Sequence, residues 1–292
     1  MFHRVMARTD PKWAGANAPY TLESGLFGEC LDFFQRHYNV VSLEQVLDAR
    51  EGRGRLPDRA LLLTFDDGWA DNAEHALPAL QARGMPALMF VVADAVGKRR
   101  PFWQEQLQSA MQRGCSVPAP FRDWQGALDG LSTMDAHERE AWLDAHRALL
   151  DDGCRHMVDG ADLVALQRGQ VALGTHGKTH VRMQEAVDLD AELGGANTLL
   201  RQHLAEAGGT APQPVMSFPH GSYDANISAR ARSQGNALAF TSEPGLNRVD
   251  PEPSWLLART GFEPQDITNA SGRLLPERLA LYLFRRPVEY LG

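Results

Sequence analysis

The sequence has few basic residues, few cysteines and no long apolar run. Its 292 residues carry 29 Lys and Arg against 37 Asp and Glu, a net charge of −8. A nucleic-acid-binding surface usually leaves a basic footprint, so this balance argues against nucleic acid as a partner. The cysteines, Cys30, Cys115 and Cys154, are odd in number and form no CxxC pair, which argues against a disulfide framework. They are typical of small buried apolar side chains.

No stretch approaches the roughly 18 apolar residues of a membrane span, and residues 1–11 contain no apolar signal core. We therefore expect a cytoplasmic protein without a membrane-spanning segment. With 43% hydrophobic and 23% charged residues, the composition is that of an ordinary globular protein. It gives no indication of an oligomeric state.

Apolar runs of strand length alternate with helical patterns along most of the chain. Residues 61–65 and 87–92 are typical of buried strands, and they flank a helical pattern at 72–83, which indicates a parallel βα unit. The same patterns predict strands at 171–173, 215–218, 237–241 and 256–260, and helices at 22–37, 190–207 and 224–233. This alternation favours an α/β sheet or a (β/α) barrel, in a single domain over residues 1–292.

The alternation breaks between residues 97 and 169. This segment carries Trp103, Trp124 and Trp142 among leucines at helical intervals, so we expect a mostly helical insertion on the barrel. A helical tryptophan stripe is typical of packing, although the same rings could line a substrate cleft. The chain is expected to end in an amphipathic helix at about 276–285.

The strongest local signal is the TFDDG run at residues 64–68, at the C-terminal end of a predicted strand. Barrels and open α/β folds place their sites at that end of the strands. Adjacent side chains leave a strand on opposite sides, so Asp66 and Asp67 can have two roles, one binding a cation and the other holding a proton acceptor. The alternative is a helix N-cap followed by an acid in the first turn.

Two histidines, His176 and His180, follow another predicted strand. Spaced four apart, they lie on one face of a helical turn and can converge on one metal ion, although such pairs are also common on surfaces. Gly177 is not the glutamate of an HExxH motif, so any base must come from elsewhere. With one aspartate they supply three ligands and leave an open position, as in hydrolytic metal sites.

A third signal lies at residues 217–224, where a predicted strand runs into a turn containing Pro219 and Gly221. The backbone N–H groups of such a tight turn could face a developing oxyanion. On its own, this segment would be an ordinary loop.

In this order, TFDDG, HxxxH and a proline-glycine turn resemble the motifs of the polysaccharide deacetylases of the NodB-homology group, carbohydrate esterase family 4. The resemblance begins with the FHRV opening at residues 2–5 and covers about residues 2–96 and 166–262. It implies a distorted (β/α) barrel with a divalent metal at its C-terminal mouth. It also implies hydrolysis of an N-acyl group from an amino sugar.

Carried over to this sequence, the resemblance implies that Asp66 is the catalytic base and that Asp67, His176 and His180 bind the metal. Zinc is expected for two imidazoles and a carboxylate, and Co, Ni, Fe or Mn suit the same ligands. The proline-glycine turn would supply the substrate and oxyanion side of the site, through Pro219, Gly221 and Tyr223.

The sequence departs from the family pattern at three places. Ser217 stands where many members carry an arginine that orients the base, and His220 replaces the usual aromatic residue of the turn. The backbone N–H of His220 can still serve the oxyanion, and its side chain becomes a candidate contact. The late leucine-x-histidine that supplies the acid is absent after residue 240, which leaves His3 as the candidate acid or as a structural strand residue.

We therefore expect a metal-dependent hydrolase that removes an acetyl or formyl group from an amino sugar in a saccharide, a lipid-linked sugar or a sugar nucleotide. Because no export signal is seen, an intracellular intermediate is favoured over an exported glycan. The alternatives are a non-catalytic sugar-binding relative, which the missing arginine and acid would favour, and a hydrolase of non-sugar amides on the same fold.

Overall fold

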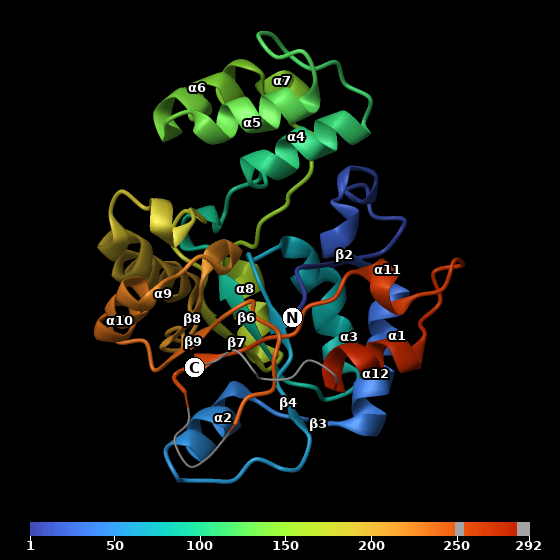
Figure 1. Cartoon of the computed structure of the whole chain (residues 1–292), viewed down its shortest axis with the longest axis vertical. Helices are drawn as coiled ribbons and strands as arrows, with labels where there is room; N and C mark the ends of the chain where they lie inside the picture. The colour runs from blue at the N-terminus through green and yellow to red at the C-terminus, as the bar shows by residue number, and fades with distance from the viewer. Residues whose placement is uncertain (249–253, 285–292) are drawn as a thin grey trace.

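A six-stranded parallel sheet forms the centre of the structure, a computed structural model that describes residues 1–248 and 254–284 (Figure 1). The strands lie in the order β10-β9-β8-β7-β6-β5. They are β5 (Thr64–Phe65), β6 (Ala87–Val91), β7 (Val171–Thr175), β8 (Val215–Ser217), β9 (Leu238–Phe240) and β10 (Leu256–Leu257). Neighbouring strands follow one another in chain order, as in a (β/α) barrel and unlike a doubly wound sheet, whose order reverses. All residues of β6, β8 and β9 are buried, as parallel strands covered on both faces should be.

The N-terminal segment extends the sheet beyond β5. Phe2 forms a parallel bridge with Phe65, and the Asp66 N–H donates to the Phe2 carbonyl at 3.0 Å. The segment continues into β1 (Arg4–Met6), which pairs in parallel with β2 (Thr21–Glu23). His3 is therefore placed beside the end of β5.

The predicted helices pack around this sheet. They correspond to α1 (Ser24–His37), α3 (Leu77–Gln81), α9 (Ala196–Ala207), α10 (Ala225–Ser233) and α12 (Pro276–Phe284). In α1 one apolar stripe, which includes Phe27, Cys30 and Phe34, is buried in the main core. The helices expected at 72–83 and 190–207 both begin with a π-helical turn, at Asn72–Ala76 and Ala191–Gly195. The predicted end of the last helix, residue 285, lies outside the described residues.

A separate helical layer stands over one end of the sheet (Figure 1). It consists of α4 (Trp103–Gln112), α5 (Trp124–Thr133), α6 (Ala136–Ala145) and α7 (Arg147–Leu150). Leu107, Ala110, Leu131, Leu143 and Leu150 form a small core of its own, against which the three tryptophans pack. The tryptophan stripe therefore serves packing, as its pattern indicated. Helix α8 (Gly160–Arg168) instead joins the main core through Leu163 and Leu166, so within the predicted insertion the separate layer spans 103–150.

All three cysteines are free thiols. Cys30 is buried as expected, but Cys115 and Cys154 are only partly buried, so the expectation of buried side chains is wrong for these two. Among residues 1–248 and 254–284, no helix has the length and apolar character needed to cross a bilayer.

Candidate metal centre and active site

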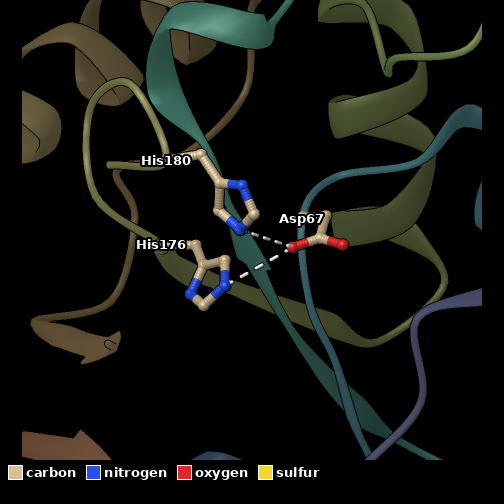
Figure 2. Close-up of side chains that lie close together, drawn as sticks. All are labelled: Asp67, His176 and His180. Atoms are coloured by element: carbon tan, nitrogen blue, oxygen red, sulfur yellow. Dashed lines mark ion pairs between the residues drawn. The ribbon is translucent and has the colours of Figure 1, made fainter. Parts of the chain in front are cut away.

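Asp67, His176 and His180 converge on one point at the C-terminal end of the sheet (Figure 2). Asp67 follows β5, and both histidines follow β7. The Asp67 Oδ1 atom lies 3.4 Å from His176 Nε2 and 3.3 Å from His180 Nε2. A tetrahedral ion with bonds of about 2.0–2.2 Å separates its ligand atoms by roughly 3.3–3.6 Å. The two measured separations therefore match edges of a metal coordination tetrahedron.

The protonation of His176 also suits a metal ligand. Its Nδ1 lies 3.0 Å from the Ser217 carbonyl oxygen, which can only accept, so Nδ1 carries the proton and Nε2 offers a lone pair towards Asp67. Burial lowers the pKa of His176 to about 4, so the ring is neutral at pH 7. Fixing the tautomer through the second ring nitrogen is how proteins orient metal-binding histidines.

Asp67 is ionised in this arrangement. Burial acts to raise its pKa, but hydrogen bonding and charge from His180, with the charges of His3 and His176, hold the pKa below its usual range. A carboxylate that faces two ring nitrogens is a donor set that a divalent cation satisfies. The chemistry of the three groups therefore fits a metal such as zinc.

Two of the three candidate ligands, Asp67 and His180, have their backbone in the left-handed region. Asp67 has φ +77° and His180 has φ +65°, values that are uncommon for residues other than glycine. Such conformations are held by the surrounding structure and concentrate at functional sites.

The prediction that residues 176–180 form a helical turn is wrong, although the two imidazoles do converge. The segment is a loop in which Gly177 has φ +70°, and a Cβ there would lie 3.0 Å from Pro219 Cγ and 3.1 Å from Met183 Cε. The buried Glu192 carboxylate accepts the N–H groups of Lys178 and Thr179 at 2.9 and 3.0 Å. The loop is thus shaped by a glycine and a carboxylate, not by helical hydrogen bonds.

Asp66 follows β5 next to the candidate ligands and is held by Arg259, a residue to which the sequence analysis assigned no role. Arg259 Nη1 and Nη2 donate to the two Asp66 oxygens at 2.6 and 2.9 Å. Arg259 also donates from Nε to the Thr241 carbonyl at 2.9 Å and from Nη2 to the Ser217 hydroxyl. Asp66 and Arg259 are 3% and 6% exposed, so this is a buried, bidentate ion pair.

The contact between Asp66 and Arg259 also shows that the sheet is curled. Asp66 follows the edge strand β5, and Arg259 follows the opposite edge strand β10. Their side chains can meet only if the sheet curls until its edges approach each other at the C-terminal end, as in a distorted barrel.

The Asp66 carboxylate is kept ionised by its partner. Burial acts to raise the pKa of Asp66, but the Arg259 guanidinium, and with smaller effects His176 and His3, bring the pKa below its usual value. No arginine stands at position 217; the guanidinium that contacts Asp66 comes from Arg259, which follows β10, and it also donates to the Ser217 hydroxyl.

His3 lies at the mouth of the barrel, near both aspartates. Its charge contributes to the lowered pKa values of Asp66 and Asp67. Its ring packs edge-on against Tyr20 with centroids 4.9 Å apart, and it lines a cavity of about 300 Å³. The position suits the predicted acid, and its role stays a prediction.

The proline-glycine turn approaches the ligands through His220. This ring packs against His180 with centroids 4.4 Å apart, and its Nε2 lies 3.2 Å from the His180 carbonyl oxygen. The Gly221 N–H donates to the Phe218 carbonyl at 3.0 Å and is thus committed to the turn. Pro219 has no N–H, which leaves the His220 N–H as the candidate oxyanion donor.

The described contacts of Tyr223 are with residues outside this cluster. Its hydroxyl donates to Glu243 at 2.9 Å, and its ring stacks on Phe218. These contacts support a packing role next to the turn.

The helical layer brings a further carboxyl group, Glu105 on α4, towards the site. Its Oε1 accepts from Asn17 at 3.5 Å, and its Oε2 is buried without a hydrogen-bond partner among the described residues. Burial raises the pKa of Glu105, and the charge of Asp67 adds to the increase. Nothing in the sequence pattern could have indicated this placement, because it depends on how the layer docks.

Residues 53–119 match the family model described as polysaccharide deacetylase. The chain is 35% identical to Bacillus subtilis YxkH over 84 residues, which are 29% of this chain and 30% of that protein. It is 25% identical to the poly-β-1,6-N-acetyl-D-glucosamine N-deacetylase of Escherichia coli K12 over 229 residues, 76% of this chain and 31% of the relative. The chain thus spans about three tenths of the length of these curated relatives.

Two solved structures share the fold over nearly the whole chain. The Streptococcus pyogenes deacetylase PplD superposes with a TM-score of 0.62 and 16% identity, covering 97% of this chain and 96% of that one. IcaB from Ammonifex degensii superposes with a TM-score of 0.57 and 19% identity, with coverages of 97% and 96%. These likenesses confirm the expected fold, a distorted (β/α) barrel.

Proposed function

We propose that this chain, which belongs with the polysaccharide deacetylases of the NodB-homology type, removes N-acetyl groups from amino sugars of a polysaccharide in a metal-dependent reaction. The observation that carries this proposal is the juxtaposition of two features at the barrel mouth. One Asp67 oxygen lies at the edge length of a coordination tetrahedron from a nitrogen of each histidine, and the three candidate ligand atoms lie within 4.8 Å of one another. A buried, arginine-held carboxylate, Asp66, lies next to them.

The name of the E. coli relative, a poly-β-1,6-N-acetyl-D-glucosamine N-deacetylase, supports a polymeric N-acetylated substrate. This differs from the preference for an intracellular intermediate drawn from the sequence. We therefore propose acetyl as the group removed and a glycan as the substrate.

Asp67, His176 and His180 would hold the metal, with zinc as the proposed ion. A divalent ion there supplies Lewis acidity, which polarises a carbonyl and makes coordinated water easier to deprotonate.

The protein side chains would handle the protons of amide hydrolysis. Asp66, which Arg259 keeps ionised, accepts a proton from the water whose oxygen bonds to the amide carbon. The His220 N–H stabilises the negative charge that develops on the carbonyl oxygen. His3 donates a proton to the nitrogen as the C–N bond breaks, and the products are acetate and a free amine.

A sequence-based alternative was a non-catalytic sugar-binding relative, favoured by the missing arginine and the missing acid. Arg259 removes the first of these reasons, because it holds Asp66 through two hydrogen bonds, and His3 is the proposed acid that answers the second. The set of base, base-orienting arginine and three metal ligands supports an enzyme.

The direct test measures acetate release from N-acetylglucosamine oligosaccharides by the zinc-loaded protein. We expect release that stops on addition of a chelator and returns with added zinc. The Asp66→Asn variant serves as a control for contaminating activity. Release that is unaffected by the chelator, or no release from any N-acetylated saccharide, would contradict the proposal.

A further inference from the structure

Trp69 binds the oxygen of Asp67 that does not face the histidines. Its Nε1–H donates to Asp67 Oδ2 at 2.8 Å, while Oδ1 is the atom near His176 and His180. The residue is 2% exposed, so the bond is shielded from water. The two oxygens of this carboxylate thus have separate partners, and the rotation of the carboxylate is fixed.

The Trp69 ring is itself fixed from two sides. The Arg4 guanidinium carbon lies 4.2 Å from the ring centroid, and this buried guanidinium donates to Asp71 Oδ2 at 2.7 and 2.8 Å. On another side, the Phe102 ring meets Trp69 edge-on with centroids 5.5 Å apart. These contacts leave the indole N–H little freedom to point anywhere but at Asp67.

Phe102 touches a second metal ligand. Its ring stacks on His180 with centroids 4.4 Å apart and an angle of 27° between the planes. Phe102 immediately precedes α4, so it lies where the chain enters the helical layer. One aromatic side chain there therefore contacts both Trp69 and His180.

The segment that returns from the helical layer binds the same turn. The Val158 N–H donates to the Gly68 carbonyl at 2.9 Å, and the Ala70 N–H donates to the His156 carbonyl at 2.8 Å. Met157 forms an antiparallel bridge with Trp69. Both connections of the layer are therefore built into the backbone and rings around Asp67.

We propose that Trp69 and Phe102 are positioning residues of the metal centre, Trp69 by fixing the Asp67 carboxylate and Phe102 by fixing the His180 ring. The helical layer then has a part in metal binding through its two connections. This inference rests on the proposed function, because it assumes that Asp67, His176 and His180 bind a metal ion. Partners of this kind orient metal ligands and typically change metal affinity by about 10–100-fold when removed.

The test uses the full-length protein, stripped of metal, and measures zinc affinity by competition with a chromophoric chelator. We expect Trp69→Phe, which removes the N–H donor, to weaken zinc binding by about 10–100-fold. Phe102→Leu should weaken it severalfold. The matched control is Trp103→Phe, one residue along, whose ring packs in the core of the helical layer; its zinc affinity should equal that of the wild type.

A second substitution separates the hydrogen bond from the packing of the ring. Replacement of Trp69 by benzothienylalanine keeps the shape of the side chain but has no N–H, so it should show the same loss even if Trp69→Phe fails to fold. If the benzothienylalanine protein binds zinc within twofold of the wild-type affinity, the inference is overturned, while the proposed function stands. If the wild type itself binds no zinc, the proposed function fails, and the inference fails with it.

Discussion

Replacing Arg259 by methionine tests the electrostatics of the site most severely. The change removes a guanidinium that donates two hydrogen bonds to Asp66, at 2.6 and 2.9 Å, in a buried position. The carboxylate would remain buried without its positive partner. Burial, which already acts to raise the Asp66 pKa, would then dominate.

The expected loss of stability is large. Breaking a buried ion pair by removing one partner costs about 3–5 kcal/mol, because an uncompensated charge is left behind. The direction in which stability changes with pH follows from the lowered pKa of Asp66. The lowered pKa of Asp66 contributes stability that is present above the unfolded value, about 3.9, and is lost as pH falls through the folded value. In Arg259→Met the Asp66 carboxyl instead lowers stability at neutral pH, since it must either take up a proton or remain charged and buried without a partner.

The effect on catalysis follows from the same shift. A general base works only when ionised, so the acidic limb of the kcat/KM profile should move to higher pH in Arg259→Met. Urea unfolding at pH 7 gives the stability change, and rates between pH 4 and 9 give the limb. The control is Arg147→Met, which removes an exposed pair with Asp144 and should alter neither measurement.

A double-mutant cycle with Asp66→Asn tests whether the loss belongs to the pair. Once Asp66 is neutral, removing Arg259 should cost much less than it does in the wild type. A loss below about 1 kcal/mol in Arg259→Met, together with an unmoved acidic limb, would refute the reasoning.

Three further outcomes are expected. Asp66→Asn should keep the metal content of the wild type and lower turnover by about 10²–10⁴-fold, whereas Asp67→Ala should lose the metal. Elemental analysis gives the metal content and acetate release gives the turnover; the reverse pattern would show that the two roles are exchanged. His3→Gln should abolish the basic limb of the pH–rate profile, since it removes the proposed acid, whereas Glu105→Gln should leave that limb in place. The opposite result would assign the role of the acid to Glu105. Gly177→Ala should lower the free energy of unfolding in urea by about 1–3 kcal/mol, because alanine is strained at this left-handed backbone and its Cβ would lie only 3.0 Å from Pro219 Cγ. Unchanged stability would show that the loop can relax.

Much of the fold could be predicted from local patterns. The apolar runs at 87–92 and 215–218 became β6 and β8, because a strand covered on both faces must be apolar throughout. Strand ends indicated that two histidines and one of two aspartates could meet, because each follows a strand and the C-terminal ends of parallel strands meet at one edge. The choice of Asp67 over Asp66 as the ligand rested on the family resemblance.

The residues that the sequence missed act across distances that local patterns do not encode. Arg259 lies 193 positions from Asp66, and their contact exists because the two edges of the sheet approach each other. Glu105 and Phe102 reach the site through the docking of the helical layer. The loop of residues 176–180 was mistaken for a helical turn, because the i, i+4 spacing alone does not show that Gly177 and His180 adopt positive φ.

Anomalous diffraction at the zinc absorption edge, from crystals of the zinc-loaded protein, tests the metal centre most directly. We expect one peak within about 2.0–2.2 Å of Asp67 Oδ1, His176 Nε2 and His180 Nε2, with Asp66 adjacent but not bound. Zinc at a different group of residues, or no peak in protein that retains acetate-releasing activity, would contradict the assignment.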